Sequence, residues 1–156
     1  MRLSDHFTLE EMCKSATAVR QGIDNLPAQD TPDGQAIIEA LTQVCLNILE
    51  PVRTHFGIPF SPSSGYRCLE LNRALKSKDT PQHVKGQAVD FELPGIANFD
   101  LAEWIRENQT FDQLILEFYT PGEPNSGWVH CSFIEDDNRG SVLTIGKQGT
   151  FEGLVR

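Results

Sequence analysis

The sequence predicts an α+β fold in which helices flank a mostly antiparallel sheet. Residues 36–52 repeat their apolar side chains every three or four positions, which is typical of a helix buried on one face. After residue 87, short apolar or alternating segments are separated by loops rich in proline and glycine, which is typical of strands. The 156 residues suit a single domain. We expect residues 1–35 to form an N-terminal helix and loop, residues 36–145 the core, and residues 146–156 a tail.

Capping and turn residues set the expected order of elements. Thr8 and Glu11 have the spacing of a capping box, so a short helix should run from there to about Ser15. A loop over 25–34 then leads to the main helix, which Pro51 should kink. The later elements are a short helix over 69–75, a polar loop over 76–81, a strand over 87–93, a helix capped by Asn98 or Asp100, and strands over 113–119, 128–133 and 142–145.

The composition argues against several classes of protein. The chain has 22 acidic and 13 basic residues and a net charge of −9, so it lacks the clustered positive charge of a nucleic-acid-binding protein. No run of residues approaches the ~18 apolar positions of a membrane-spanning helix. The N-terminus has no apolar segment of the kind that a secretory signal contains. We therefore expect cytoplasmic synthesis without a signal peptide, no membrane insertion, no nucleic-acid partner and a monomer.

The four cysteines stand singly, without a CxxC pair. This spacing favours neither a cysteine-based zinc site nor a disulfide scaffold, so reduced thiols are expected. Cys131 directly follows His130, which raises the possibility of a cysteine nucleophile with a histidine base. Adjacent residues of a strand point to opposite faces, however, so these two side chains are not expected to meet.

Two histidines and one aspartate could hold a metal ion. His83 stands in a loop seven residues before Asp90, which lies in the strand that follows, and His130 lies in a separate strand. If the two strands are neighbours, the three side chains can converge. Two histidines and a carboxylate, with a fourth position left for water, are typical of a catalytic zinc site. The spacing alone leaves a purely structural role open. It also leaves open a non-haem iron site, although that site usually has its first histidine and carboxylate two residues apart.

Several motifs, in their order along the chain, resemble one family. They are Ser64-Gly65-Tyr66-Arg67, the segment from His83 to Asp90, and Trp128-Val129-His130. This combination resembles the zinc D-alanyl-D-alanine carboxypeptidases and L-alanyl-D-glutamate endopeptidases, which cleave the peptide part of bacterial peptidoglycan. The resemblance covers most of the chain and implies the hedgehog/DD-peptidase-like fold. The opening residues 6–11 and the strand region 111–118 resemble a phage or prophage branch.

The resemblance also implies roles for individual residues. His83, Asp90 and His130 match the Zn²⁺ ligands. Arg67 matches an arginine that binds substrate and stabilises the developing oxyanion, although a buried ion pair that holds the turn is the alternative. Pro81 replaces a serine that the family often has two residues before its first histidine, so Thr80 or Gln82 is expected to supply a polar group. The expected substrate contacts are Ser64, Tyr66, Gln82 and Trp128.

The position of the general base departs from the family pattern. The family usually has an acidic residue three positions before its last histidine, and this chain has Gly127 there. A hydrolytic zinc site needs a base within hydrogen-bond reach of its water. Glu117 is the expected substitute, because an ionisable residue inside an apolar strand is costly to bury without a purpose. Glu123 and Glu92 are the second and third choices.

These observations predict a zinc metallopeptidase that hydrolyses stem-peptide bonds of peptidoglycan, as a carboxypeptidase or an endopeptidase. Its expected partners are stem peptides or D-Ala-D-Ala-type dipeptides. The lack of a signal suits an enzyme made by a phage and released at lysis or carried in the virion. The alternative is a non-catalytic, zinc-containing module that binds cell wall or protein and has lost the general base.

Overall fold

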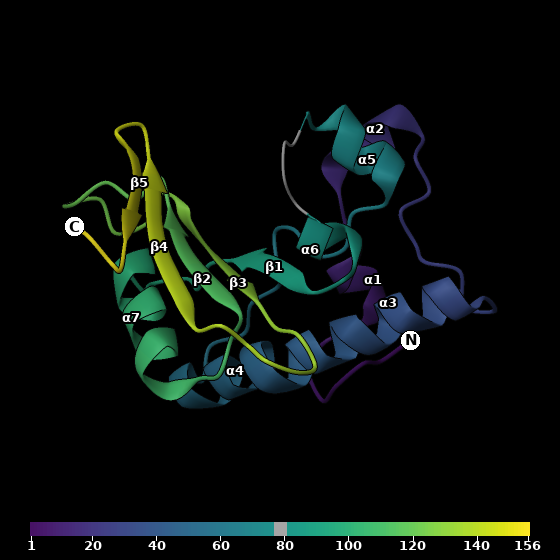
Figure 1. The fold of residues 1–156 in the computed structure, drawn as a ribbon, viewed down its shortest axis with the longest axis horizontal. Helices are drawn as coiled ribbons and strands as arrows, with labels where there is room; N and C mark the ends of the chain where they lie inside the picture. The colour runs from purple at the N-terminus through teal and green to yellow at the C-terminus, as the bar shows by residue number, and fades with distance from the viewer. Residues whose placement is uncertain (77–80) are drawn as a thin grey trace.

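The computed structural model describes residues 1–76 and 81–156 (Figure 1). Thr80 and most of the predicted polar loop lie outside these ranges. The described helices are α1 (Leu9–Met12), α2 (Ala16–Gln21), α3 (Pro32–Val44), the π-helical turn η1 (Cys45–Leu49), α4 (Glu50–Phe56), α5 (Leu69–Ala74), α6 (Pro81–Val84) and α7 (Asn98–Asn108). The described strands are β1 (Ala88–Phe91), β2 (Gln113–Glu117), β3 (Trp128–Ser132), β4 (Ser141–Gly146) and β5 (Gly149–Glu152).

The predicted α+β fold with a mostly antiparallel sheet is confirmed. In the described part of the chain, one sheet has the strand order β1-β3-β2-β4-β5. Every neighbouring pair is antiparallel except β2 and β4, which are parallel. Helices α3 and α4 run along one side of the sheet, while α2, α5 and α6 gather beyond the β1 end (Figure 1).

The N-terminal helices differ in part from the prediction. The capping box of Thr8 and Glu11 is present, but α1 ends at Met12. Ser15 begins a second helix, α2, because its side chain accepts a hydrogen bond from the Ala18 N–H. The sequence analysis took Ser15 for the end of a helix, whereas it caps the next one.

The predicted main helix is present and begins earlier than expected. Thr31 caps it and Pro32 occupies its first turn, so α3 starts at Pro32. The predicted kink at Pro51 is replaced by an irregular turn just before it. In this turn, η1, the helix is wider and the Glu50 N–H donates to the Cys45 carbonyl. Proline has no N–H to donate, so a wider turn just before it interrupts the helical hydrogen bonds at little further cost.

The two faces of the sheet have different environments. One face packs its apolar side chains against α3 and α7 in the main hydrophobic core, through Val89, Phe91, Leu114, Leu116 and Val129. Because side chains alternate along a strand, the opposite face carries residues 90, 113, 115, 117 and 130. All the polar candidates on the strands therefore share one face.

Two details of the C-terminal half correct the prediction. Neither Asn98 nor Asp100 caps α7, whose N-cap is Ala97 without a side-chain bond. The Asn98 amide instead donates to the Glu92 carboxylate and to the carbonyls of Ser126 and Gly127. The predicted tail contains β5, which pairs with β4. Among the described residues, no helix combines the length and apolar character needed to cross a membrane.

Candidate active site

His83 lies on the one-turn helix α6, not in the loop that the sequence suggested. Its side chain is 1% exposed, and its Nδ1 lies 2.6 Å from the Gly65 carbonyl oxygen. A carbonyl oxygen only accepts hydrogen bonds, so Nδ1 donates to it and Nε2 is the ring nitrogen left to bind a metal. That Nε2 lies 3.5 Å from Oδ1 of Asp90. A backbone carbonyl that fixes the tautomer in this way is typical of metal-binding histidines.

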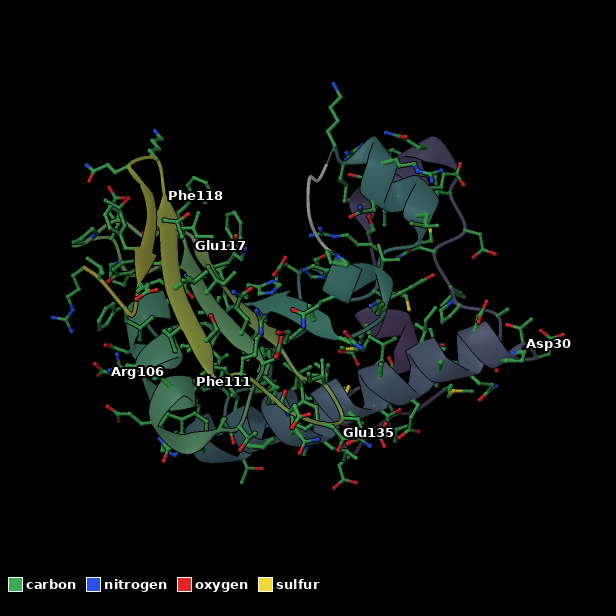
Figure 2. The ribbon with its side chains drawn as sticks, viewed as in Figure 1. Asp30, Arg106, Phe111, Glu117, Phe118 and Glu135 are labelled. Carbon is green, nitrogen blue, oxygen red and sulfur yellow. The ribbon has the colours of Figure 1, made fainter. Side chains whose placement is uncertain are left out.

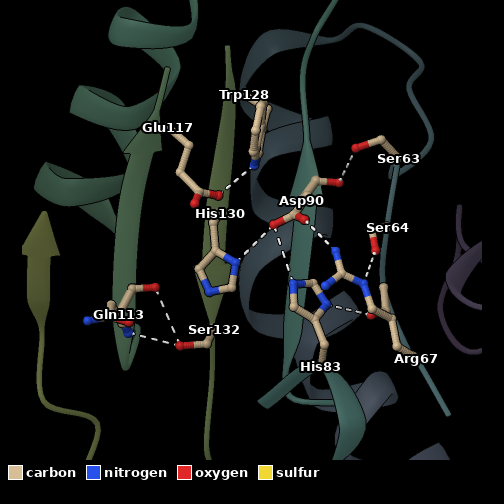
Figure 3. A network of polar contacts seen from close by, with 11 residues as sticks. Ser63, Ser64, Arg67, His83, Asp90, Gln113, Glu117, Trp128, His130 and Ser132 are labelled. Carbon is tan, nitrogen blue, oxygen red and sulfur yellow. Dashed lines mark hydrogen bonds and ion pairs between the residues drawn. The ribbon is translucent and has the colours of Figure 1, made fainter. Parts of the chain in front are cut away.

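Asp90 and His130 face each other across two neighbouring strands. The antiparallel register of β1 and β3 pairs these two residues directly, and His130 Nδ1 lies 2.9 Å from Asp90 Oδ1. Together with His83, they place one ligand atom each within 4.8 Å of the others (Figure 3). All three residues are at least nine-tenths buried. The structure thus brings together the three residues that the sequence analysis proposed as ligands.

The donor set fits a zinc ion. Two imidazole nitrogens and one carboxylate are common zinc ligands, and a tetrahedral ion with bonds of about 2.0–2.2 Å separates its ligand atoms by about 3.4 Å. The distance between His83 Nε2 and Asp90 Oδ1 is 3.5 Å, which is close to that separation. Burial raises the pKa of Asp90, but hydrogen bonds and positive charge from His130 and His83 outweigh it and lower the pKa. The carboxylate is therefore ionised.

Arg67 lies beside the ligand group on an extended segment that pairs with β1 through Ser64 and Asp90. Its Nη2 contacts Asp90 Oδ2 at 3.3 Å, and its Nε donates to the Ser64 hydroxyl at 3.0 Å. Arg67 lines the cleft described below, whereas Ser64 does not line it and holds the guanidinium through this hydrogen bond. Tyr66, an expected substrate contact, packs in the hydrophobic core and is not among the residues that line the cleft.

Asn25, to which the sequence analysis assigned no role, holds the chain in place on both sides of Arg67. Its buried amide donates to the carbonyls of Cys13 and Tyr66, and its Oδ1 accepts from the Cys68 N–H. The sequence places Asn25 at the start of a loop, and nothing in its neighbours indicates these long-range bonds. Asn25 thereby ties the end of α1 to the segment that carries Arg67.

Glu117 enters the site from β2, the strand on the other side of β3 (Figure 3). The register pairs Ile115 with His130 and Glu117 with Trp128, so Glu117 is one pair further along the same face. Trp128 Nε1 donates to Glu117 Oε2 at 2.5 Å. Burial raises the pKa of Glu117, and the charge of Asp90 raises it further, against smaller lowering effects of His130, Trp128 and Arg67.

Gly127 is a glycine because the backbone requires one. Its φ is +67°, and a Cβ there would lie 2.0 Å from the Glu117 carbonyl oxygen. An acidic side chain at this position is therefore incompatible with the turn that leads into β3. Of the alternative bases, Glu92 accepts a hydrogen bond from Asn98, and neither Glu92 nor Glu123 lines the cleft.

The cleft has a volume of about 900 Å³ and extends from Arg67 and α6 to β4 and β5. Gln82 and Trp128, two of the expected substrate contacts, line it. The Gln82 amide, however, donates to Asp112 at 2.8 Å, and Arg139 forms a two-pronged ion pair with the same carboxylate. Glu117 and Phe118 lie together at the end of β2, with Phe111 near its beginning (Figure 2).

Two histidines and a carboxylate, next to a further carboxylate and a guanidinium in one cleft, define the class of zinc-dependent hydrolases. Comparison with protein families gives the particular family: the peptidase M15 model matches residues 5–132. The chain belongs to the peptidase M15 family, whose members are zinc-dependent. No curated protein matches the chain. The family match ends at Ser132, so β4 and β5 lie outside it.

Proposed function

We propose that this protein is a zinc metallopeptidase that hydrolyses amide bonds in the stem peptides of bacterial peptidoglycan, acting as a monomer. The observation that carries the proposal is the convergence of His83, Asp90 and His130 in a cleft that also contains Glu117. Membership of the M15 family supports peptide-bond hydrolysis. The choice of peptidoglycan rests on the resemblance of the motifs around Arg67, His83 and His130 to peptidases that cut this polymer.

The three ligand residues would hold the zinc ion, which when bound supplies a Lewis acid that activates water and polarises the scissile carbonyl. Glu117 accepts the proton of the attacking water and returns it to the leaving amine. Its Oε2 is held by Trp128, which leaves Oε1 for the proton. The raised pKa of Glu117 suits this role, because a base works best when its pKa approaches the working pH.

Arg67 supports the same reaction from the opposite side of the ligand group. Two of its five N–H donors contact Ser64 and Asp90, and the other three have no partner in the described part of the chain. They would stabilise the negative charge that develops on the carbonyl oxygen, as a fixed cation does in many acyl-transfer sites. The ion pair with Asp90 and the substrate role, which the sequence presented as alternatives, are compatible in this arrangement.

We propose a phage or prophage origin on the resemblance of residues 6–11 and 111–118 alone. An enzyme of that kind reaches the cell wall by release at lysis or within a virion.

Metal content gives the first test of the site. We expect about one zinc per chain in the purified protein, measured by elemental mass spectrometry, and its loss in His83→Ala. His55→Ala is the matched control, because His55 stacks on Trp104 away from the cleft, and it should keep the zinc. If the wild-type protein takes up no stoichiometric zinc after reconstitution, the proposal is wrong.

Hydrolysis gives the second test. Digestion of muropeptides, followed by mass spectrometry, should yield cleaved stem peptides. Glu117→Gln should keep the zinc and lose about 10²- to 10⁴-fold in rate, the usual contribution of a general base. Glu123→Gln should behave as wild type. A protein that keeps zinc but cleaves no muropeptide would support the non-catalytic binding module instead.

A further inference from the structure

Phe118 departs from the pattern of the strand that precedes it. Side chains alternate along β2, and Leu114 and Leu116 face the hydrophobic core. Continued alternation would place Phe118 in the core as well. Its ring is instead 44% exposed, and Tyr119 packs against the core in its place. Burial of an aromatic ring stabilises a fold, so the exposed position of Phe118 needs an explanation other than core packing.

The backbone at Phe118 turns the ring away from the core. Its φ is +54°, in the left-handed region that bulky side chains rarely adopt. The pairing with β4 still includes this residue, since the Phe118 N–H donates to the Ile145 carbonyl at 2.7 Å. Strained backbone of this kind gathers at functional sites, where the surrounding structure holds it in place.

The ring of Phe118 stacks on the indole of Trp128. The two ring centroids lie 5.5 Å apart and the planes differ by 28°. The same indole donates from Nε1 to Glu117 Oε2 at 2.5 Å (Figure 3). Glu117 and Trp128 are direct partners in the register of β2 and β3, so both lie on the cleft face of the sheet. In a regular strand residue 118 would point to the opposite face. The positive φ lets two consecutive residues contact one indole, one at its N–H and the other at its ring.

The stack restrains an indole that is not enclosed by the core. Trp128 is partly exposed, so solvent rather than packed side chains covers part of its ring. Among the described residues, the aromatic ring that stacks on it is that of Phe118. Stacked aromatic pairs are more stable than their buried area alone accounts for. Loss of the Phe118 ring would leave the indole freer to rotate, and its N–H would no longer stay on Glu117 Oε2.

We propose that Phe118 is a positioning residue for the general base: its ring fixes the Trp128 indole, whose N–H holds one oxygen of the Glu117 carboxylate. The other oxygen, Oε1, is thereby kept for the proton of the attacking water. Phe118 does not line the cleft, so it acts through Trp128 and not on the substrate. The inference rests on the proposed peptidase function and adds a residue on which its base depends.

The first test compares muropeptide hydrolysis by zinc-loaded variants of the full chain. Phe118→Leu removes the ring and should lower kcat roughly 2- to 12-fold with little change in KM, as the usual energy of an aromatic pair implies. Phe118→Tyr keeps the ring and should keep the wild-type rate. Phe151→Leu is the matched control and should also keep it. Phe151 is likewise 44% exposed but lies on β5, while the ring stacked on Trp128 is that of Phe118.

A double-mutant cycle separates this role from a purely structural one. Trp128→Phe keeps an aromatic ring but removes the N–H that holds Glu117. If Phe118 acts through that N–H, Phe118→Leu should have no further effect on kcat in the Trp128→Phe background. Two effects that multiply in the double variant would refute the proposal. Circular dichroism and zinc content check each variant, and Phe118→Met serves if Phe118→Leu folds poorly.

The orientation of the indole can also be measured without turnover. The chain has two tryptophans, so the Trp128 indole N–H signal in an NMR spectrum is the one missing from Trp128→Phe. In Phe118→Leu this signal should move towards its position in Glu117→Ala, where the hydrogen bond is absent. A signal that stays at the wild-type position would overturn the proposal. If no peptide is cleaved, the proposed function fails, and the NMR spectrum still decides whether Phe118 holds the indole on residue 117.

Discussion

Replacement of Gly127 by alanine tests why this chain has no acidic residue three positions before His130. We expect that the turn before β3 leaves no room for a side chain at this position. The residue has φ +67°, which costs a residue with a Cβ about 1–2 kcal/mol. The new Cβ would also lie 2.0 Å from the Glu117 carbonyl oxygen and 2.6 Å from the Phe118 carbonyl carbon. These are backbone atoms of a paired strand end, so relief requires movement of the strand, at about 1–3 kcal/mol.

The sum is a loss of about 2–5 kcal/mol, which corresponds to a fall in Tm of roughly 4–20 °C for a domain of this size. Gly140→Ala is the matched control: its φ is +65°, but nothing lies within 4 Å of the added Cβ. Gly140→Ala therefore measures the cost of the positive φ without a steric clash. The assay is thermal unfolding of both variants, with muropeptide hydrolysis measured below their Tm. Gly127→Ala should also lose activity, because the strand movement displaces Glu117.

A double variant tests whether an acidic residue at position 127 could replace Glu117 as the general base. In Glu117→Gln/Gly127→Glu the carboxylate stands at the position that the family usually uses, and we expect no recovery of hydrolysis, because the turn cannot hold that side chain. Recovery of wild-type rates would refute the reasoning, as would a Gly127→Ala variant no less stable than Gly140→Ala.

Three further predictions concern parts of the molecule around the site. Hydrogen bonds from Arg139 hold the pKa of Asp112 below its usual 3.8, so this contribution to stability is present above that value and is lost as the pH falls through the lowered pKa. Arg139→Gln should therefore lower the urea midpoint at pH 7, and its difference from the wild type should shrink as the pH falls. Asn25→Ala leaves buried backbone groups without partners and should cost on the order of 3 kcal/mol in urea unfolding, with weaker hydrolysis. Of the four cysteines, only Cys68, which is partly buried, should react with a thiol reagent at pH 8 in the folded protein. The other three are buried, and burial raises the pKa of Cys45 to about 12. Mass spectrometry of the treated protein counts the labelled thiols. The first prediction is contradicted if Arg139→Gln keeps the wild-type pH dependence of stability, and the second if Asn25→Ala keeps the wild-type urea midpoint. Rapid labelling of all four thiols would contradict the third.

The elements that the sequence missed are those with little local signal. Helix α6 has only four residues and β5 is exposed along its length. A one-turn helix is too short to show a helical period, and a strand exposed on both faces shows no alternation. The expected cap of α7 was wrong for a different reason. Asn98 is a good capping residue in isolation, but its Nδ2 donates to carbonyls of the loop before β3. Its Oδ1, the atom that would cap the helix, has no hydrogen-bond partner among the described residues, so a tertiary contact outweighs a local preference.

The sequence by itself determined the types of residue and their local settings: the capping box at Thr8, the long apolar stripe, and the positions of Asp90 and His130 in two strands. Only the tertiary structure decided which of these side chains meet. Glu117 is near His130 because β2 lies next to β3, and Leu143 is near Ile115 because β4 lies next to β2. Strand order depends on long-range packing over the whole core, whereas side-chain alternation depends on the backbone of each strand alone.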